Sequence, residues 1–342
     1  MLSSINGQTN VISSRFGAGS INGIGKEVGK FVVMTMEIPW QITKDLIGSA
    51  PEAVIFIDSV EKKVLDREID SLPSCDSVIG IGGGRAIDAA KYMAWKRNIR
   101  LITIPTILSV DAFVTPAAAV RGNHEVVYIG NVSPDPLIID YDVIRTAPVT
   151  LNIAGIGDIL SVHTATYDWE LAEQKGKSEY VFSKEDIVKA REILYDLYAI
   201  LPAIRGVTDT GLQAIVDGYM RLNTICIPAG HSRVEEGSEH YLFYELEERL
   251  QRAFIHGHII GLGIYLMSRL QNNQVNEITR IMDEVGLEYH PVGMNIKKTD
   301  LIASLKNLKS FIINRENLWY TIINDTPISD EWILWVLSCL KF

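Results

Sequence analysis

Cysteine is scarce in this chain of 342 residues, which contains only Cys75, Cys226 and Cys339. Three thiols so far apart cannot form a disulfide framework or a cysteine zinc site, so they predict a reducing compartment. The first sixteen residues lack the charged segment and the apolar run of a signal peptide. No apolar stretch reaches the length of about 18 residues that a membrane span needs. We therefore expect a cytoplasmic protein without stable membrane insertion.

Positive charge is also in short supply, because 32 Lys and Arg residues stand against 42 Asp and Glu residues and the formal net charge is -10. A surface that binds nucleic acid needs concentrated basic residues, whereas Lys and Arg are scattered here. Nucleic acid is therefore excluded as an expected partner. An acidic protein can still bind an anion locally through backbone N–H groups. Proline is sparse, and the hydrophobic fraction of 47% is that of an ordinary globular protein.

The length fits two domains of roughly 150 to 180 residues, and the pattern of the first part is that of an α/β fold. Short apolar runs alternate there with segments of helical period, and the runs are Phe31–Met34, Ala53–Ile57, Ser77–Ile81 and Leu101–Ile104. Continuous apolar strands separated by helices predict a parallel sheet covered on both faces. We predict a Rossmann-like α/β domain over residues 1–148.

The second part of the chain has helical periodicity and almost no strand signal. Apolar residues recur every three to four positions over residues 149–172, 184–201, 211–227, 239–252 and 257–271. We predict an all-α domain over residues 149–342, with the boundary near residue 148.

A glycine-rich turn, Gly82–Gly84, joins the run Ser77–Ile81 to a predicted helix. Glycines let backbone N–H groups approach an anion, and a helix N-terminus carries about half a positive charge, so the turn is a candidate pyrophosphate site. It departs from the usual dinucleotide fingerprint because Arg85 occupies the third glycine position. The alternative is a tight connection without a ligand, in which Asp88 and Lys91 only pair with each other on the helix.

Taken with later motifs, this turn resembles the iron-containing alcohol dehydrogenase superfamily, which includes glycerol dehydrogenase, glycerol-1-phosphate dehydrogenase and dehydroquinate synthase. The likeness extends over nearly the whole chain. The motifs that carry it are Phe16–Gly19, Gly82–Gly84 with Asp88 and Lys91, Ile104–Thr106, Ser109–Asp111, Thr115 with Pro116, Pro136–Asp140, Gly155–Asp158, Gly237–His240 and His256 with Gly257.

The glycerol-1-phosphate branch is the nearest match within this superfamily, because Tyr167–Trp169, Gly237–His240 and Trp319–Ile322 look like its signatures. Dehydroquinate synthase fits less well, since its asparagine-led histidine motif is absent. The resemblance implies a dehydroquinate synthase-like fold. It also implies that residues 1–148 bind NAD or NADP and that residues 149–342 bind the metal and the substrate.

The resemblance further implies a divalent metal held by Asp158, His240 and His256. Two imidazoles and one carboxylate with an open position describe a catalytic site, and Zn²⁺ suits these donors best, with Fe²⁺ or Ni²⁺ as alternatives. Each residue also has a structural interpretation: Asp158 as a helix N-cap, and each histidine as a buried hydrogen-bonded side chain. His258, two positions after His256, is not counted as a ligand because it points to another side of a helix.

The resemblance implies roles for other polar residues too. The implied catalytic residues are Asp158, His240 and His256 together with Asp111, which would bind a substrate hydroxyl or join a proton relay. An ordinary turn is the alternative role for Asp111. The residues implied to contact the cofactor are Gly82, Gly83, Gly84, Arg85, Asp88, Thr106 and Ser109. After the first predicted strand, Glu37 could hold the adenosine ribose of NAD, whereas a nearby cation would admit NADP.

The expected activity is that of a metal-dependent NAD(P)-linked oxidoreductase that reduces dihydroxyacetone phosphate to sn-glycerol-1-phosphate. Departures from the branch pattern keep other substrates open, because Val110 replaces a histidine and Glu235 and Glu236 replace a small, proline-containing segment. Extra carboxylates near a phosphate would repel it. Tyr244 and His258 are further departures.

Alternative functions therefore remain beside the expected one. The first is a dehydrogenase of glycerol or another polyol, sugar or cyclitol, with or without phosphate, or a dehydroquinate synthase-like carbocyclase. The second is a catalytically silent homologue retained for binding or assembly. In the enzymatic cases the partner is a small polyol, sugar or phosphate substrate, and a homo-oligomer is compatible with the sequence.

Overall fold

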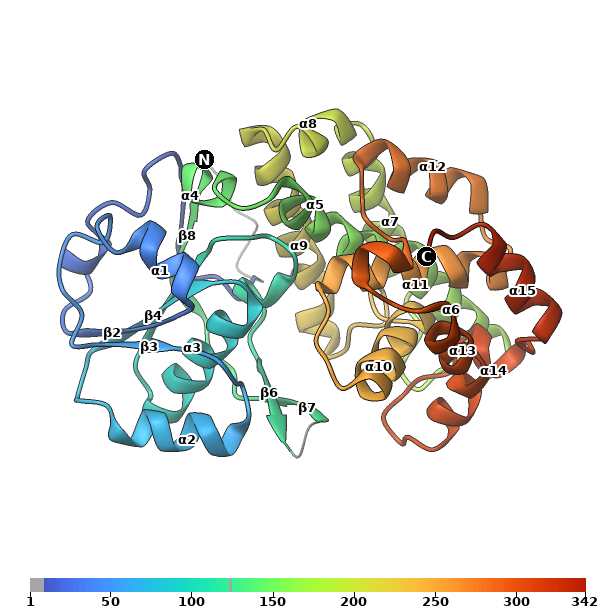
Figure 1. Ribbon diagram of the computed structural model, residues 1–342, viewed down its shortest axis with the longest axis horizontal. Coiled ribbons are helices and arrows are strands. Elements are labelled where there is room, and N and C mark those ends of the chain that lie inside the picture. The colour runs from blue at the N-terminus through green and yellow to red at the C-terminus, as the bar shows by residue number, and fades with distance from the viewer. Residues whose placement is uncertain (1–8, 123–124) are drawn as a thin grey trace. The chain divides into compact units, whose positions relative to one another are not determined.

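A computed structural model describes residues 9–122 and 125–342 of the chain. Residue contacts divide these into two compact units (Figure 1). The first unit comprises the described residues up to Asn152 together with Tyr219–Thr224, and the second comprises Ile153–Gly218 and Ile225–Phe342. The boundary expected near residue 148, and the ligands assigned to each side of it, stay predictions.

A parallel six-stranded sheet forms the centre of the first unit, with the strand order β1-β8-β5-β4-β2-β3. The strands are β1 (Ser14–Gly17), β2 (Phe31–Thr35), β3 (Ala53–Phe56), β4 (Ser77–Gly82), β5 (Arg100–Pro105) and β8 (Pro134–Asp140). Strands β2 to β5 match the four apolar runs in the sequence. The parallel sheet confirms the predicted fold class, and β1 and β8 extend the sheet beyond β5.

Both faces of this sheet are buried, which explains why its strands lack polar alternation. Successive residues of a strand point to opposite faces, and the β2 residues accordingly divide between two apolar clusters. Val32 and Met34 belong to one cluster, while Phe31 and Val33 belong to the other. The helices of this unit are α1 (Glu37–Thr43), α2 (Lys62–Ser71), α3 (Gly84–Arg97) and α4 (Tyr141–Arg145), and β6 (Ala118–Gly122) and β7 (Glu125–Ile129) form an antiparallel pair.

The regular elements among the described residues of the second unit are all helices, as the periodicity predicts. Helix α5 begins just before the unit and continues into it, and α9 runs through both parts of the division. The helices are α5 (Val149–Leu160), α6 (Val162–Gln174), α7 (Lys184–Tyr198), α8 (Leu201–Arg205), α9 (Asp209–Ala229), α10 (Ser238–Leu250), α11 (His256–Gln271), α12 (Val275–Val285), α13 (Lys298–Ile313), α14 (Ile322–Asp325) and α15 (Asp330–Ser338). Within the described ranges, none of the helices combines the length and the apolar character that crossing a membrane would take.

The predicted helix over residues 149–172 is in fact two helices, α5 and α6, because the helix is interrupted at Ser161. The Ser161 hydroxyl donates to the backbone carbonyl of Glu235, 2.5 Å away, which fixes the break against a loop distant in sequence. Asp158 lies near the end of α5 and not at its start. The N-cap interpretation of Asp158 is therefore wrong, because the helix begins nine residues earlier, directly after Pro148.

Candidate active site

The glycine turn of the first unit lies between β4 and α3. Gly82 ends the strand with a φ of 145°, a conformation that residues with a Cβ rarely adopt. A Cβ on Gly84 would approach Val110 Cγ1 to 2.9 Å, so the turn packs closely against the segment that follows β5. The N-cap of α3 is Gly83, which has no side chain with which to cap the helix. The turn thus presents backbone at a helix N-terminus, which is the arrangement that binds phosphate groups in other proteins.

The other residues predicted to contact the cofactor are placed in different ways. Thr106 and Ser109 are buried in the segment after β5, and the Thr106 N–H donates to the Gly82 carbonyl at 3.0 Å. Arg85 is exposed in the first turn of α3, where its guanidinium lies 3.4 Å from the Asp58 carbonyl. Asp111 begins a short 3-10 helix in the same unit. Backbone geometry therefore gathers the glycines, Thr106 and Ser109 at the carboxyl ends of β4 and β5.

Asp88 is engaged differently from the glycines. Its buried carboxylate pairs with Lys91 Nζ at 2.9 Å and accepts the Ala119 N–H at 3.1 Å. Lys91 also donates to the Ala117 carbonyl at 2.6 Å. Burial raises the pKa of Asp88, while Lys91 acts in the opposite direction. The pair fastens α3 to the start of β6, so the geometry favours the structural interpretation of Asp88, and its contact with a cofactor stays a prediction.

In the second unit, Asp158, His240 and His256 come together from α5, α10 and α11. Each offers one ligand atom, and these atoms lie within 4.8 Å of one another. Asp158 Oδ1 lies 3.0 Å from His256 Nε2 and 3.6 Å from His240 Nε2. These residues are separated by 82 and 16 positions in the sequence, so the helical packing creates the cluster. The cluster does not include His258.

Glycines let the helices that carry these side chains approach backbone to backbone. A Cβ on Gly157, the neighbour of Asp158, would overlap the Gly257 carbonyl, and a Cβ on Gly257 would overlap the Ala154 carbonyl. On α11, a Cβ on Gly263 would lie 2.6 Å from the Glu239 carbonyl. The distance between α5 and α11, and with it the distance between Asp158 and His256, depends on the absence of these side chains.

The charge around the cluster fits a bound cation. Burial alone would raise the pKa of Asp158 and lower that of His240. The charge of His256 and the contact with His240 lower the pKa of Asp158 below its ordinary value, and the contacts with Asp158 and Glu239 raise that of His240 well above its own. The carboxylates of Glu239 and Glu236 add further negative charge beside His240. Two imidazoles, one carboxylate and this excess of negative charge suit a divalent metal such as Zn²⁺.

His240 is held from behind by Glu239, a residue that the sequence motif contains but to which sequence reasoning assigned no role. Glu239 Oε1 lies 2.8 Å from His240 Nδ1, and both residues are buried. A carboxylate on the second ring nitrogen is a common arrangement for metal-binding histidines. In the sequence, the available signal for this role is a carboxylate directly before a candidate ligand. The contact of Glu239 with the Thr164 hydroxyl, 75 residues away, cannot be read from the sequence.

The three signature segments of the sequence meet around Asp168 of α6. Its buried carboxylate accepts the N–H of Ser238 and the N–H of Ile322, each at 2.8 Å. These two residues begin α10 and α14, so one carboxylate caps the N-termini of two helices. The Trp319 N–H donates to the Tyr241 hydroxyl at 2.6 Å. Asp168, in one signature segment, therefore fixes the start of α10, which carries His240.

Asp168 predicts a pH dependence of stability. Burial, and next the charge of Glu239, raise the pKa of Asp168 from 3.8 to about 6. The folded protein thus binds this proton more tightly than the unfolded chain, so the contribution is present below about pH 4 and is lost as the pH rises through about 6. We expect wild type to lose about 2 kcal/mol between pH 4 and pH 6 relative to Asp168→Asn. Urea unfolding at both pH values measures this, and a difference that does not change with pH would contradict it.

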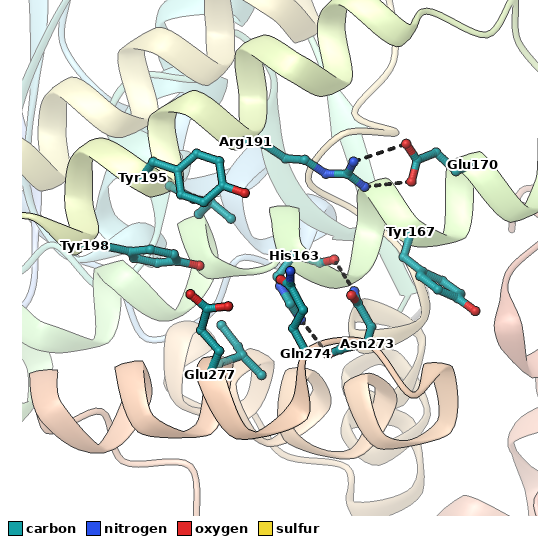
Figure 2. A pocket seen from close by; sticks show the side chains of 11 residues that line it. His163, Tyr167, Glu170, Arg191, Tyr195, Tyr198, Asn273, Gln274 and Glu277 are labelled. Atoms are coloured by element: carbon teal, nitrogen blue, oxygen red, sulfur yellow. Dashed lines mark hydrogen bonds and ion pairs between the residues drawn. The ribbon is translucent and has the colours of Figure 1, made fainter.

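His163 lies on another face of α6 and is placed as a structural residue. Its Nε2 contacts the Asn273 carbonyl at 3.0 Å, and the Asn273 side chain donates to the His163 carbonyl at 3.0 Å. Both residues border a pocket of about 250 Å³ among α6, α7 and the start of α12 (Figure 2). Arg191 and Glu170 also line this pocket, and Figure 2 shows their paired contacts, which measure 2.7 and 3.1 Å. His163 therefore lies outside the cluster of Asp158, His240 and His256.

Comparison with known proteins agrees with this architecture. A family model described as iron-containing alcohol dehydrogenase matches residues 35–148. The glycerol-1-phosphate dehydrogenase [NAD(P)+] of Hyperthermus butylicus is 32% identical over 257 residues, which cover 74% of this chain and 71% of that relative. The chain belongs to the iron-containing alcohol dehydrogenase family. Both the family resemblance and the class of enzyme predicted from the sequence, a dehydrogenase, are confirmed.

Solved structures show the same fold over nearly the whole chain. A probable glycerol dehydrogenase from Sinorhizobium meliloti is similar with a TM-score of 0.72 and 20% identity, covering 96% of this chain and 97% of that one. A sulfoacetaldehyde reductase from Bifidobacterium kashiwanohense, solved in complex with NAD+, has a TM-score of 0.67 and 13% identity, with 97% of each chain covered. At these identities the similarity establishes the fold alone.

Proposed function

We propose that this chain is a metal-dependent NAD(P)-linked dehydrogenase that reduces dihydroxyacetone phosphate to sn-glycerol-1-phosphate. The observation that carries the proposal is the convergence of Asp158, His240 and His256 within 4.8 Å. That cluster belongs to a chain whose relative from Hyperthermus butylicus bears the name of this activity. The three residues would hold a divalent metal, with Zn²⁺ the best match to their donor atoms and Fe²⁺ or Ni²⁺ as alternatives.

The proposed cofactor site is the glycine turn of the first unit. Gly82, Gly83 and Gly84 would bind the pyrophosphate through backbone N–H groups at the start of α3. Arg85, Thr106 and Ser109 would add side-chain contacts. This assigns NAD(P) to the first unit and the metal and substrate to the second. Glu37, exposed in the first turn of α1 directly after β2, is the candidate contact for an adenosine ribose.

The proposed role of each side chain follows from whether it would bind the metal or the substrate. A divalent metal, when bound, polarises the ketone oxygen as a Lewis acid, and the reduced nicotinamide supplies the hydride. Asp158 would contribute a carboxylate oxygen whose negative charge offsets part of the metal charge, and His240 and His256 would each contribute an imidazole nitrogen. Glu239 contacts the other ring nitrogen of His240, Nδ1, at 2.8 Å. Asp111 would bind a substrate hydroxyl or pass a proton.

The proposed reaction is tested with metal-loaded protein, dihydroxyacetone phosphate, and NADH or NADPH in parallel. We expect oxidation of the reduced cofactor and a product of the sn-1 configuration, identified with a stereospecific enzyme. The ratio of initial rates with the two cofactors decides between NAD and NADP. Formation of the sn-3 isomer, or no cofactor oxidation with this substrate, would refute the assignment.

A second candidate, a dehydrogenase of an unphosphorylated polyol, is favoured by the position of Glu236. This half-buried carboxyl interacts electrostatically with all three residues of the cluster; burial is the main cause of its raised pKa, and the charge of His240 opposes that rise. A negative charge near the substrate would disfavour a phosphate group. A panel of glycerol, other polyols and their phosphates would therefore rank this candidate against the first.

The influence of Glu236 on substrate charge is also testable by substitution. We expect Glu236→Gln to raise kcat/KM for a phosphorylated substrate relative to its unphosphorylated form by about tenfold, equivalent to roughly 1.4 kcal/mol of removed repulsion. Glu235→Gln, one residue earlier in the same loop, serves as the matched control. Equal changes for both substrates in Glu236→Gln would mean that this carboxylate does not select on charge.

A further inference from the structure

Glu239 is a carboxylate with no exposed surface whose two oxygens are both occupied. Oε1 accepts the Gly237 N–H at 2.6 Å and contacts His240 Nδ1 at 2.8 Å, while Oε2 accepts the Thr164 hydroxyl at 2.7 Å. Burying a carboxylate costs several kcal/mol unless hydrogen bonds and opposite charge compensate for the lost hydration. The fold therefore provides three partners for a group that an apolar side chain would replace at less cost.

Within residues 9–122 and 125–342, the contacts of the Glu239 carboxylate include no Lys or Arg, and its ion pair is with His240. The Gly237 N–H and the Thr164 hydroxyl are neutral donors that fix where the carboxylate lies without neutralising it. The ion pair of Glu239 is thus made with an imidazole whose opposite nitrogen, Nε2, lies 3.6 Å from Asp158 Oδ1.

We propose that Glu239 is the positioning residue for His240, holding the proton on Nδ1 so that the Nε2 lone pair points toward Asp158 and His256. A neutral imidazole has one N–H and one lone pair, and the hydrogen bond made by one nitrogen decides which is which. A carboxylate on Nδ1–H also makes Nε2 a stronger donor to a metal. This inference rests on the proposed metal site and adds a residue to it.

Thr164 is the second part of this arrangement. It is fully buried on α6, and the Gln271 side chain of α11 donates to its carbonyl at 3.0 Å. Behind Glu239, the close approach of Gly263 leaves no room for a Cβ. The backbone of Glu239 is thus packed against α11, and the Thr164 hydroxyl of α6 contacts its carboxylate.

Zinc affinity, measured by competition with a chromophoric chelator and without substrate, tests the inference. Glu239→Gln keeps the shape and an acceptor oxygen but removes the charge, and we expect about tenfold weaker binding. Glu239→Leu removes the acceptor as well, and we expect about a hundredfold loss. Nitrogen-15 shifts of His240 in the zinc-loaded protein should show an Nδ1-protonated ring in wild type and a changed pattern in Glu239→Leu.

The matched pair Thr164→Val and Thr166→Val separates positioning from stability. Thr166 is also fully buried on α6, but its hydroxyl donates to the Val162 carbonyl and accepts from Arg191. Both variants should lower the melting temperature of the metal-free protein, whereas only Thr164→Val should weaken zinc binding, by several-fold. Equal zinc affinity in wild type and Glu239→Leu, or equal losses in the two threonine variants, would overturn the inference.

Failure of the inference is distinguishable from failure of the proposed function. Zinc that binds in a His240-dependent manner but is indifferent to Glu239 overturns the positioning role alone. Zinc binding that survives His240→Ala overturns the metal site together with this role. Because the assay contains no substrate, an error in the assigned reaction does not affect its result.

Discussion

Replacing His256 with alanine is expected to lower kcat of the metal-loaded enzyme about a thousandfold, which corresponds to roughly 4 kcal/mol of lost transition-state stabilisation. His256 Nε2 lies 3.0 Å from Asp158 Oδ1, so its removal takes one of three donors from the cluster. The glycine turn belongs to the other unit, so this substitution changes none of its residues. Cofactor affinity, measured by fluorescence titration, should therefore change little.

His163→Ala is the matched control for this substitution. His163 is a buried histidine of the same unit, and its ring contacts the Asn273 carbonyl instead of the cluster. We expect the control to lose stability but to bind metal with wild-type stoichiometry. Chelator-treated wild-type protein should resemble His256→Ala and recover on addition of metal. Turnover of the metal-free protein at the rate of the loaded protein would show that the cluster is not catalytic.

Gly257→Ala is expected to abolish metal binding or prevent the second unit from folding, although it adds a single methyl group. The new Cβ would overlap the Ala154 carbonyl, and backbone atoms cannot yield as a flexible side chain does. Overpacking in cores ordinarily costs about 1–3 kcal/mol. Here relief requires α11 to move away from α5, which separates His256 from Asp158. Metal content and the melting temperature measure both consequences.

Gly261→Ala, one turn further along α11, is the control for this effect. A Cβ there would approach Leu287 Cδ2 to 3.0 Å and Tyr289 Cβ to 3.1 Å, tight contacts that shifts of a few tenths of an ångström relieve, and neither residue belongs to the cluster. We expect this variant to bind metal normally. If Gly257→Ala bound metal as tightly as Gly261→Ala, the spacing of α5 and α11 would not control the cluster.

The central strands of the sheet are predictable because both faces of the sheet are covered. Their residues are apolar in succession, as in Phe31–Met34, and such runs stand out from the helical periodicity around them. The break between α5 and α6 is not predictable in the same way. No proline or glycine marks Ser161, and the bond that fixes it goes to Glu235, 74 residues away. Local propensity carries no information about such a partner.

The candidate cluster shows the same contrast. Asp158, His240 and His256 are widely spaced, and it was resemblance to a family rather than any periodicity that grouped them. The structure brings these three residues together, as the resemblance implies, while their function as metal ligands stays a prediction. The sequence shows that the motif Gly237–His240 contains a glutamate, but not what the Glu239 side chain contacts. Its role depends on the Thr164 hydroxyl, and 75 residues separate the two.

The bond between Asp168 and Ile322 spans 154 residues, and this separation bears on how the protein is made. During synthesis the helix carrying Asp168 leaves the ribosome long before Ile322 does. Until then the Asp168 carboxylate can accept a hydrogen bond from the Ser238 N–H but not from Ile322. The Tyr241 hydroxyl likewise lacks its hydrogen bond from the Trp319 N–H. A nascent or truncated chain ending before residue 319 therefore contains Asp158, His240 and His256 but lacks both of these supports. Chains released early should bind metal weakly and be preferred substrates for proteases.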